Sequence, residues 1–261
     1  TGSATRGADG DIQFLQWGDS GGLGGIVLAP VTVEDCYLLT IEAFNLAEEY
    51  RCPVFIASNK EIGMTRESID LDSLKIPPVK SRKAPPDDKS FQPFQVPEGS
   101  HVPYFLPIGG KTLVRQTSST HGADGYITAN AREIAENRSR LKKKLEKVEE
   151  NPFFEFYGGN DDTLVITYGV TARAAKTSYF HHGDDKRPFS LLVLKTLWPV
   201  PENLIQMKAE GFPGILVAEM NLGQYIREIR RVLCGKEVDF LGRMDGRLIT
   251  PNQIREAVEN G

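Results

Sequence analysis

Apolar and polar positions early in the chain follow the pattern of a strand, a helix and a second strand. Residues 26–30 are an apolar run that ends in proline, which predicts a buried strand. Thr32 and the acidic residues after it match a capping box, and apolar residues then recur at helical spacing to about Tyr50. Residues 53–57 form the next apolar run. Together these patterns predict a βαβ unit, the building block of a parallel sheet.

The same alternation returns in the C-terminal part of the chain. Strands are expected at 163–167, 191–195, 215–219 and 238–241. Helices are expected at 170–179, 201–210, 224–233 and 252–259, with Pro251 at the first helical position of the last one. This pattern indicates a doubly wound α/β domain.

The middle of the chain has a different composition. Eight of the 16 prolines lie between Pro77 and Pro107, where they oppose helix and strand alike. We therefore expect an extended connection, which could wrap over a neighbouring surface. A helix is expected at about 131–148, with Asn130 as its N-cap. Glutamates are interleaved with its lysine run, which favours a solvated helix face over a nucleic-acid patch.

The predicted organisation is therefore a first α/β part at 1–75, a proline-rich connection with a helix at 76–160, and a second α/β domain at 161–261. Residues 1–25 are rich in glycine and are expected to form a long loop. Its glycines precede a strand, whereas those of a dinucleotide-binding motif follow one, so a flexible loop is favoured over phosphate binding. These glycines are Gly18, Gly21, Gly22, Gly24 and Gly25.

Composition and charge exclude several classes of partner and metal site. The 31 basic and 35 acidic side chains give a formal net charge of −4, which favours neither nucleic acid nor an anionic membrane as a partner. No apolar run approaches the roughly 20 residues that span a bilayer. The three cysteines form no Cys-x-x-Cys pair, so they cannot build a zinc or iron–sulfur site by themselves. Their scarcity favours a reducing cytoplasm.

Candidate metal and catalytic residues are few. His181 and His182 stand beside an acidic turn at 183–185, and imidazole and carboxylate groups both suit metal ions. A solvated turn is favoured, because adjacent side chains point apart. His101 and His121 have no evident partner. Neither Gly-x-Ser-x-Gly nor His-Glu-x-x-His occurs, so no catalytic set and no metal site is predicted.

Three segments nevertheless carry motifs in a consistent order. The first reads Thr-Gly-Ser-Ala-Thr-Arg at 1–6 and Gly-Asp at 10–11; the second reads Val-Leu-Ala-Pro at 27–30 and Thr-Ile-Glu-Ala-Phe-Asn-Leu-Ala-Glu at 40–48. The third reads Val-Ala-Glu-Met-Asn-Leu-Gly-Gln at 217–224 and Asp-Gly-Arg-Leu-Ile-Thr-Pro at 245–251, and Lys-Thr-Leu-Trp-Pro at 195–199 adds a fourth match. Together they resemble the C-terminal portion of the α subunit of 2-oxoacid:ferredoxin oxidoreductases.

The resemblance implies an α/β fold that contains the end of a thiamine-diphosphate pyrimidine-binding domain, followed by a doubly wound transketolase C-terminal-like domain. It implies oxidative decarboxylation of a 2-oxoacid, with 2-oxoglutarate favoured, and coenzyme A to acyl-CoA and CO₂, with ferredoxin as electron acceptor. Thiamine diphosphate would be shared with a β subunit, which would hold Mg²⁺ and a [4Fe–4S] cluster. The principal catalytic residues are expected upstream of Thr1, and none within these residues.

One substrate-binding residue follows from the resemblance. Thr5 matches the family threonine whose hydroxyl contacts the substrate carboxylate, although Ala4 and Arg6 replace the usual proline and lysine around it. Gly10 and Asp11 do not complete the metal-binding motif of thiamine-diphosphate enzymes, because isoleucine replaces its last glycine and the next asparagine comes 34 residues after Asp11.

Two other interpretations stay open. The chain could be a non-catalytic α/β module that only binds a companion subunit, or the β-type subunit of a thiamine-dependent 2-oxoacid dehydrogenase. The first predicts no turnover even in the presence of the companion. The motifs at 1–11 and 40–48 argue against the second.

Overall fold

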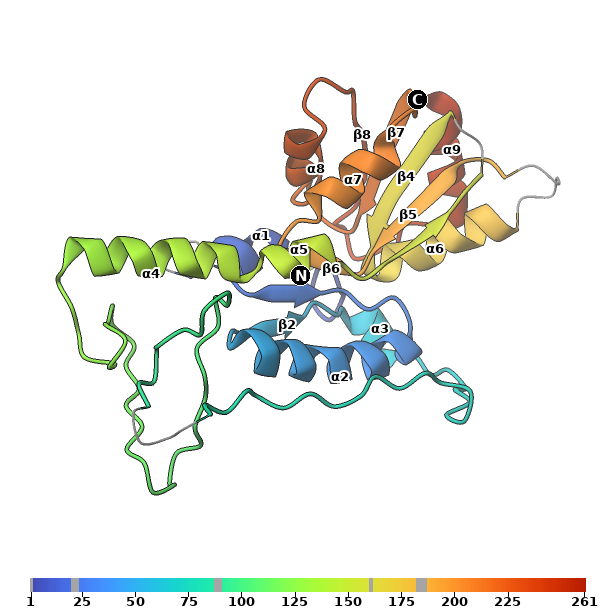
Figure 1. The fold of residues 1–261 in the computed structure, drawn as a ribbon. Helices are drawn as coiled ribbons and strands as arrows, with labels where there is room; N and C mark the ends of the chain where they lie inside the picture. Colours follow the sequence, from blue (N-terminus) through green and yellow to red (C-terminus); the bar gives the residue numbers. More distant parts are fainter. Residues whose placement is uncertain (1, 20–23, 87–90, 160–161, 182–186) are drawn as a thin grey trace.

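The computed structural model of the protein describes residues 2–19, 24–86, 91–159, 162–181 and 187–261. These residues form two α/β units joined by an extended connection (Figure 1). The first unit has a three-stranded sheet in the order β2-β1-β6, and the second has a five-stranded sheet in the order β3-β5-β4-β7-β8. The predicted α/β class is therefore confirmed.

The predicted βαβ unit is present in the first unit. It consists of β1 (Ile26–Leu28), α2 (Val33–Tyr50) and β2 (Val54–Ile56), with β1 and β2 parallel. The Thr32 hydroxyl accepts a hydrogen bond from Asp35 N at 3.0 Å and caps α2, as its position before the helix predicts. The third strand, β6 (Thr196–Trp198), comes from the C-terminal part of the chain and pairs antiparallel with β1. The two units therefore share a sheet.

In the second unit, four strands are parallel and are covered by helices on both faces, as the doubly wound pattern predicts. Alternate side chains of these strands point to opposite faces and belong to two separate apolar clusters, one with α7 and α8 and the other with α6 and α9. The strands are β4 (Thr163–Tyr168), β5 (Ser190–Leu194), β7 (Gly214–Glu219) and β8 (Asp239–Gly242). The helices are α6 (Gly169–Phe180), α7 (Glu202–Ala209), α8 (Ile226–Val232) and α9 (Pro251–Asn260).

Besides β6, three further short elements were not expected. α1 (Ile12–Trp17) lies inside the stretch predicted to be a loop, and that prediction is wrong there. Its six residues are too few to show a helical period, and the Trp198 indole stabilises it by donating to Ile12 O at 3.0 Å. α3 (Lys60–Met64) follows β2, and β3 (Phe154–Tyr157) adds an antiparallel edge to the second sheet.

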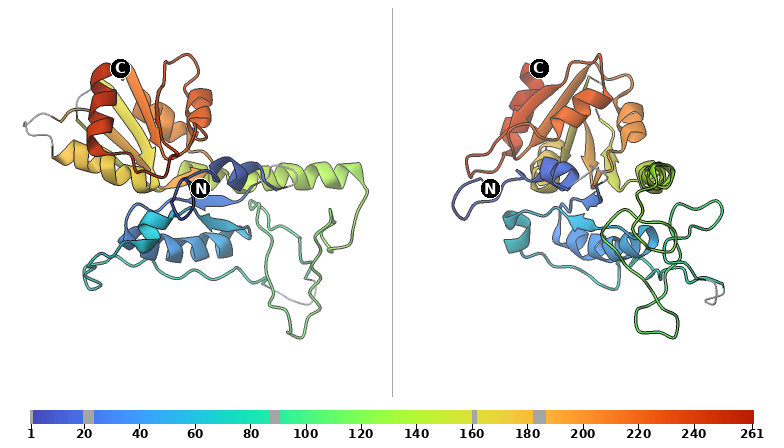
Figure 2. Two further views of the ribbon diagram at one scale, coloured as in Figure 1. Left: turned by 180° about the vertical axis from the view of Figure 1, so that it is seen from behind. Right: turned by 90° about the vertical axis from the view of Figure 1, so that its left-hand side faces the viewer.

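The proline-rich connection is extended in its described residues and passes along α2 before it reaches α4 (Figures 1 and 2). Asn45 of α2 binds the backbone of the connection through two hydrogen bonds: its Oδ1 accepts from Lys80 N at 2.8 Å, and its Nδ2 donates to Pro78 O at 3.0 Å. The helix expected at 131–148 is instead two helices, α4 (Ala131–Lys144) and α5 (Glu146–Glu150), separated at Leu145. None of the helices in the described ranges combines the length and the apolar composition of a membrane-spanning segment. The domain boundaries stay a prediction.

Candidate functional site

The N-terminal segment, residues 2–11, lies between the two units and contains the predicted substrate-binding Thr5. On the side of the first unit, Lys60 Nζ donates to Thr5 O at 2.5 Å and Gly7 N donates to Glu61 Oε1 at 3.3 Å. Both partners belong to α3, a helix that Asn59 caps by accepting from Ile62 N. The segment is therefore held in place by an element that the sequence pattern did not reveal.

The second unit holds the same segment from the other side. Asp9 N donates to Met220 O at 2.8 Å, and Asn221 Nδ2 donates to Asp9 O at 3.0 Å. Gln224 Nε2 donates to Gly10 O at 2.6 Å. These three partners follow β7, in the motif at 217–224, so two of the sequence motifs meet in space. The structure thus joins segments that lie more than 200 residues apart.

Thr5 occupies a tight turn at the surface. Arg6 N donates to Ser3 O at 3.2 Å across the turn, and Thr5 has a φ of 62°, in the left-handed region that β-branched residues avoid. Its side chain is exposed. Within the part of the chain that the structure describes, the Thr5 hydroxyl has no hydrogen-bond partner. Backbone strain of this kind is concentrated at functional sites, so Thr5 remains a candidate.

Asp9 is the ionisable group of this segment with the most unusual environment. Its Oδ1 accepts from Asn59 Nδ2 at 3.3 Å, but its Oδ2 is buried without a hydrogen-bond partner in the described structure. Burial raises the pKa of Asp9 to about 7, and the nearby carboxylates of Glu219, Glu61 and Asp11 add to the effect. Asp9 therefore titrates near neutral pH.

Glu219 ends β7 and is completely buried. Its carboxylate accepts four hydrogen bonds: from the Tyr168 hydroxyl (2.8 Å), Asn221 Nδ2 (2.8 Å), Tyr225 N (3.0 Å) and Ile226 N (3.0 Å). The two backbone donors are at the N-terminal end of α8, where a negative charge is favoured. Sequence reasoning missed this role, although an acidic residue at the end of an apolar strand was a usable signal.

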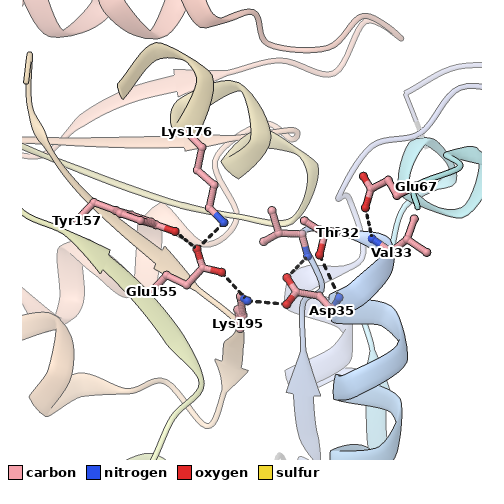
Figure 3. A network of polar contacts seen from close by, with 9 residues as sticks. Thr32, Val33, Asp35, Glu67, Glu155, Tyr157, Lys176 and Lys195 are labelled. Carbon is pink, nitrogen blue, oxygen red and sulfur yellow. Dashed lines mark hydrogen bonds and ion pairs between the residues drawn. The ribbon is translucent and has the colours of Figure 1, made fainter. Parts of the chain in front are cut away.

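A second polar network, shown in Figure 3, joins the two units at the N-terminal end of α2. Lys195 Nζ contacts Asp35 Oδ1 of the first unit and Glu155 Oε1 of the second, both at 2.6 Å. Glu155 also pairs with Lys176 and accepts from the Tyr157 hydroxyl at 2.7 Å. Burial alone would raise the pKa of Glu155, but hydrogen bonds from Lys176, Lys195 and Tyr157 outweigh it and lower the pKa to about 2.

Replacing Lys195 with glutamine is expected to reduce the free energy of unfolding by about 2 kcal/mol, because two partly buried carboxylates lose their shared cation. Urea unfolding at pH 7 measures the change. Lys142→Gln is the matched control, since Lys142 is exposed on α4 and should change stability by less than about 0.5 kcal/mol. Equal stability of the two variants would show that the network does not join the units.

The other residues considered from sequence do not gather into a site. Gly18 is the C-cap of α1 and Gly24 has a φ of 53°, while Gly21 and Gly22 lie outside the described residues. His181 ends α6; His182 and the turn at 183–185 also lie outside them. Among the described residues, no group of three or more His, Cys, Asp or Glu side chains is placed to hold a metal ion. The three cysteines are unpaired.

The chain matches two protein families along most of its length. Residues 1–140 match the family described as pyruvate flavodoxin/ferredoxin oxidoreductase, thiamine diphosphate-binding, and residues 161–254 match pyruvate:ferredoxin oxidoreductase core domain II. The first match covers more than half of the chain. The chain therefore belongs to the pyruvate flavodoxin/ferredoxin oxidoreductase family, and the resemblance to 2-oxoacid:ferredoxin oxidoreductases is confirmed.

Individual relatives agree with this family. The chain is 32% identical to the 2-oxoglutarate synthase subunit KorA of Methanothermobacter thermautotrophicus and 35% identical to that of Methanothermobacter marburgensis, in each case over 97% of this chain and 68% of the relative. It is 26% identical to the ketoisovalerate oxidoreductase subunit VorB of the latter organism, over 93% of this chain and 62% of the relative. The relatives are named as subunits of enzymes, which implies further subunits.

A solved structure shares the fold. The 2-oxoglutarate:ferredoxin oxidoreductase from Magnetococcus marinus, a structure with 2-oxoglutarate, coenzyme A and succinyl-CoA bound, superposes with a TM-score of 0.84 at 20% identity. The match covers 98% of this chain and 45% of that chain. The chain therefore spans about half the length of the solved protein, and the likeness shows the fold.

Proposed function

We propose that this protein is the α subunit of an enzyme that oxidatively decarboxylates a 2-oxoacid, with 2-oxoglutarate favoured. The 2-oxoacid and coenzyme A would give acyl-CoA, CO₂ and a proton, and the two electrons released would reduce two ferredoxin molecules. The observation that carries the proposal is the match to the KorA subunits over 97% of the chain. 2-Oxoglutarate is favoured over branched 2-oxoacids because the identity to VorB is lower.

Thiamine diphosphate is the cofactor that the family of residues 1–140 binds. When bound, its thiazolium ring accepts the electron pair released as CO₂ leaves. We propose, from the resemblance of the sequence motifs, that a β subunit shares this cofactor and holds Mg²⁺ and a [4Fe–4S] cluster. The few unpaired cysteines support a cytoplasmic location.

Within this chain, Thr5 is the proposed substrate-binding residue. Its exposed hydroxyl has no partner in the described structure, and α3 fixes its backbone through Lys60. A fixed hydroxyl can donate to a substrate carboxylate at little entropic cost. The contacts that the N-terminal segment makes with both units would hold this donor in place.

Thr5→Val is expected to lower kcat/KM for the 2-oxoacid by about tenfold or more, the effect of losing a hydrogen bond to a charged group. Thr5→Ser keeps the hydroxyl and is expected to retain most of the activity. Steady-state kinetics of both variants, with unfolding curves as a check on stability, test the assignment. An unchanged kcat/KM in Thr5→Val would remove Thr5 from the site.

The activity itself is tested with the full-length protein purified anaerobically with its companion subunit. We expect reduction of ferredoxin or methyl viologen that requires both coenzyme A and a 2-oxoacid. Failure with 2-oxoglutarate, pyruvate and branched-chain 2-oxoacids alike would contradict the proposal and favour a non-catalytic interaction module.

A further inference from the structure

A basic pocket lies where α4, the C-terminal end of α2 and the proline-rich connection meet. It has a volume of about 280 Å³. Four cationic side chains line it: Arg51, Arg138, Arg140 and Lys144. The described residues around it include no aspartate or glutamate, but they include four consecutive hydroxyl side chains, at 117–120. The lysine run of α4 is thus only partly a solvated face, because Lys144 is half-buried against this pocket.

These cations have no carboxylate partner within the described ranges. Arg51 Nη1 donates to the carbonyl oxygens of Pro93 and Tyr104, and Lys144 Nζ donates to Arg51 O at 3.3 Å. Arg140 donates to His101 O and to Asn137 Oδ1. Just outside the pocket, by contrast, Arg82 and Lys80 each pair with a glutamate of α2. Among the described residues, neighbouring cations are therefore neutralised by carboxylates, whereas those of the pocket are not.

This arrangement is unfavourable without a counterion. Burial lowers the pKa of Lys144, and the charges of Arg140 and Arg51 lower it further. Burial and the nearby Arg140 likewise lower the pKa of His121. An anion among these groups would remove the repulsion and satisfy donors that now have only carbonyl partners.

His121 supplies a further unsatisfied group. Its Nδ1 contacts Ser119 O at 3.0 Å, and its ring packs against Phe94 with the ring centres 3.7 Å apart. Its Nε2 is buried and has no hydrogen-bond partner in the described structure. His121 thus adds an unsatisfied polar group to the lining of the pocket, but the four cations and the hydroxyl side chains at 117–120 carry the argument.

We propose that the basic pocket binds a phosphate-bearing small molecule. A phosphate group offers oxygens in several directions, which suits guanidinium, ammonium and hydroxyl donors that converge from different elements. A carboxylate has two oxygens in one plane and would leave part of this set unused. The volume is near the lower end of the range for ligand pockets, so it suits a group the size of pyrophosphate. Coenzyme A and thiamine diphosphate of the proposed reaction also carry a pyrophosphate, but this site is inferred from its own donors and not from that reaction.

Competitive acetylation of lysines, read by mass spectrometry on the protein together with its companion subunits, tests the proposal with inorganic pyrophosphate as the probe. Saturating pyrophosphate is expected to slow the acetylation of Lys144 by about tenfold. Lys142 is two residues away on α4, is exposed and does not line the pocket, so its rate should not change. Citrate at the same ionic strength should protect Lys144 much less.

Arg138→Gln is the decisive variant, because Arg138 lines the pocket and makes no hydrogen bond or ion pair with other described residues. The pyrophosphate concentration for half-protection should rise about tenfold. The site would be overturned if pyrophosphate did not slow the acetylation of Lys144, or if it slowed Lys144 and Lys142 equally. An Arg138→Gln protein with an unchanged pyrophosphate concentration for half-protection would also overturn it. Equal protection by citrate would overturn the choice of a phosphate ligand. None of these results depends on turnover, so they are independent of the proposed enzyme activity.

Discussion

Glu219→Gln is expected to lower the free energy of unfolding by about 4 kcal/mol. The carboxylate of Glu219 accepts four hydrogen bonds in a completely buried position. A glutamine amide has one acceptor oxygen, so its NH₂ group must face either the N–H of Ile226 or the donors of Tyr168, Asn221 and Tyr225. In either orientation a buried donor faces another donor, and the charge at the N-terminal end of α8 is lost.

Urea unfolding at pH 7 measures this effect. Glu210→Gln is the control, because Glu210 is exposed at the end of α7 and should change stability by less than about 0.5 kcal/mol. Tyr168→Phe removes one of the four bonds and should cost about 1–2 kcal/mol. A Glu219→Gln protein as stable as the control would show that this network does not hold the end of β7 against α8.

Asp9→Asn is expected to abolish the loss of stability that the wild-type protein shows as the pH rises through about 7. The folded-state pKa of Asp9 is about 7, whereas the ordinary value is 3.8, so the folded protein binds this proton more tightly than the unfolded chain. The stability that this group contributes is fully present below pH 3.8 and is lost as the pH rises through about 7. The loss amounts to about 4 kcal/mol, and asparagine, which does not titrate, should not show it.

Denaturant unfolding from pH 4 to pH 8 tests this. The wild-type protein should lose stability over the interval, and the Asp9→Asn curve should lie above it at pH 8 and close to it at pH 4. Asp19→Asn is the matched control: Asp19 is exposed after α1 and is not among the carboxylates that raise the pKa of Asp9, so this variant should keep the wild-type dependence. If the Asp9→Asn protein still lost stability between pH 4 and pH 8, another group would be responsible for the pH dependence.

These two residues link stability to the proposed function. Asp9 and Glu219 lie on opposite sides of the contact between the N-terminal segment and the second unit, where Asn221 donates both to Asp9 O and to Glu219 Oε2. The same segment presents Thr5. A change in either acid is therefore expected to disturb the position of the Thr5 hydroxyl.

The sequence predicted the parts of the fold that depend on short-range patterns. The βαβ unit, the Thr32 cap of α2 and the alternating elements of the second unit all follow from the spacing of apolar residues and from capping chemistry. Each of these signals lies within one element, where side-chain spacing alone decides which face is buried. The motif order also identified the family.

Only the tertiary structure determined how these parts meet. β6 follows β5 after the single residue Lys195 but pairs with β1, which no local pattern indicates. The short helices α1 and α3, the burial of Asp9 and the uncompensated cations around Lys144 likewise depend on contacts between distant segments. Apolar spacing reports which side of an element is buried but not which element covers it, so the shared sheet, the fixed N-terminal segment and the basic pocket became visible only in three dimensions.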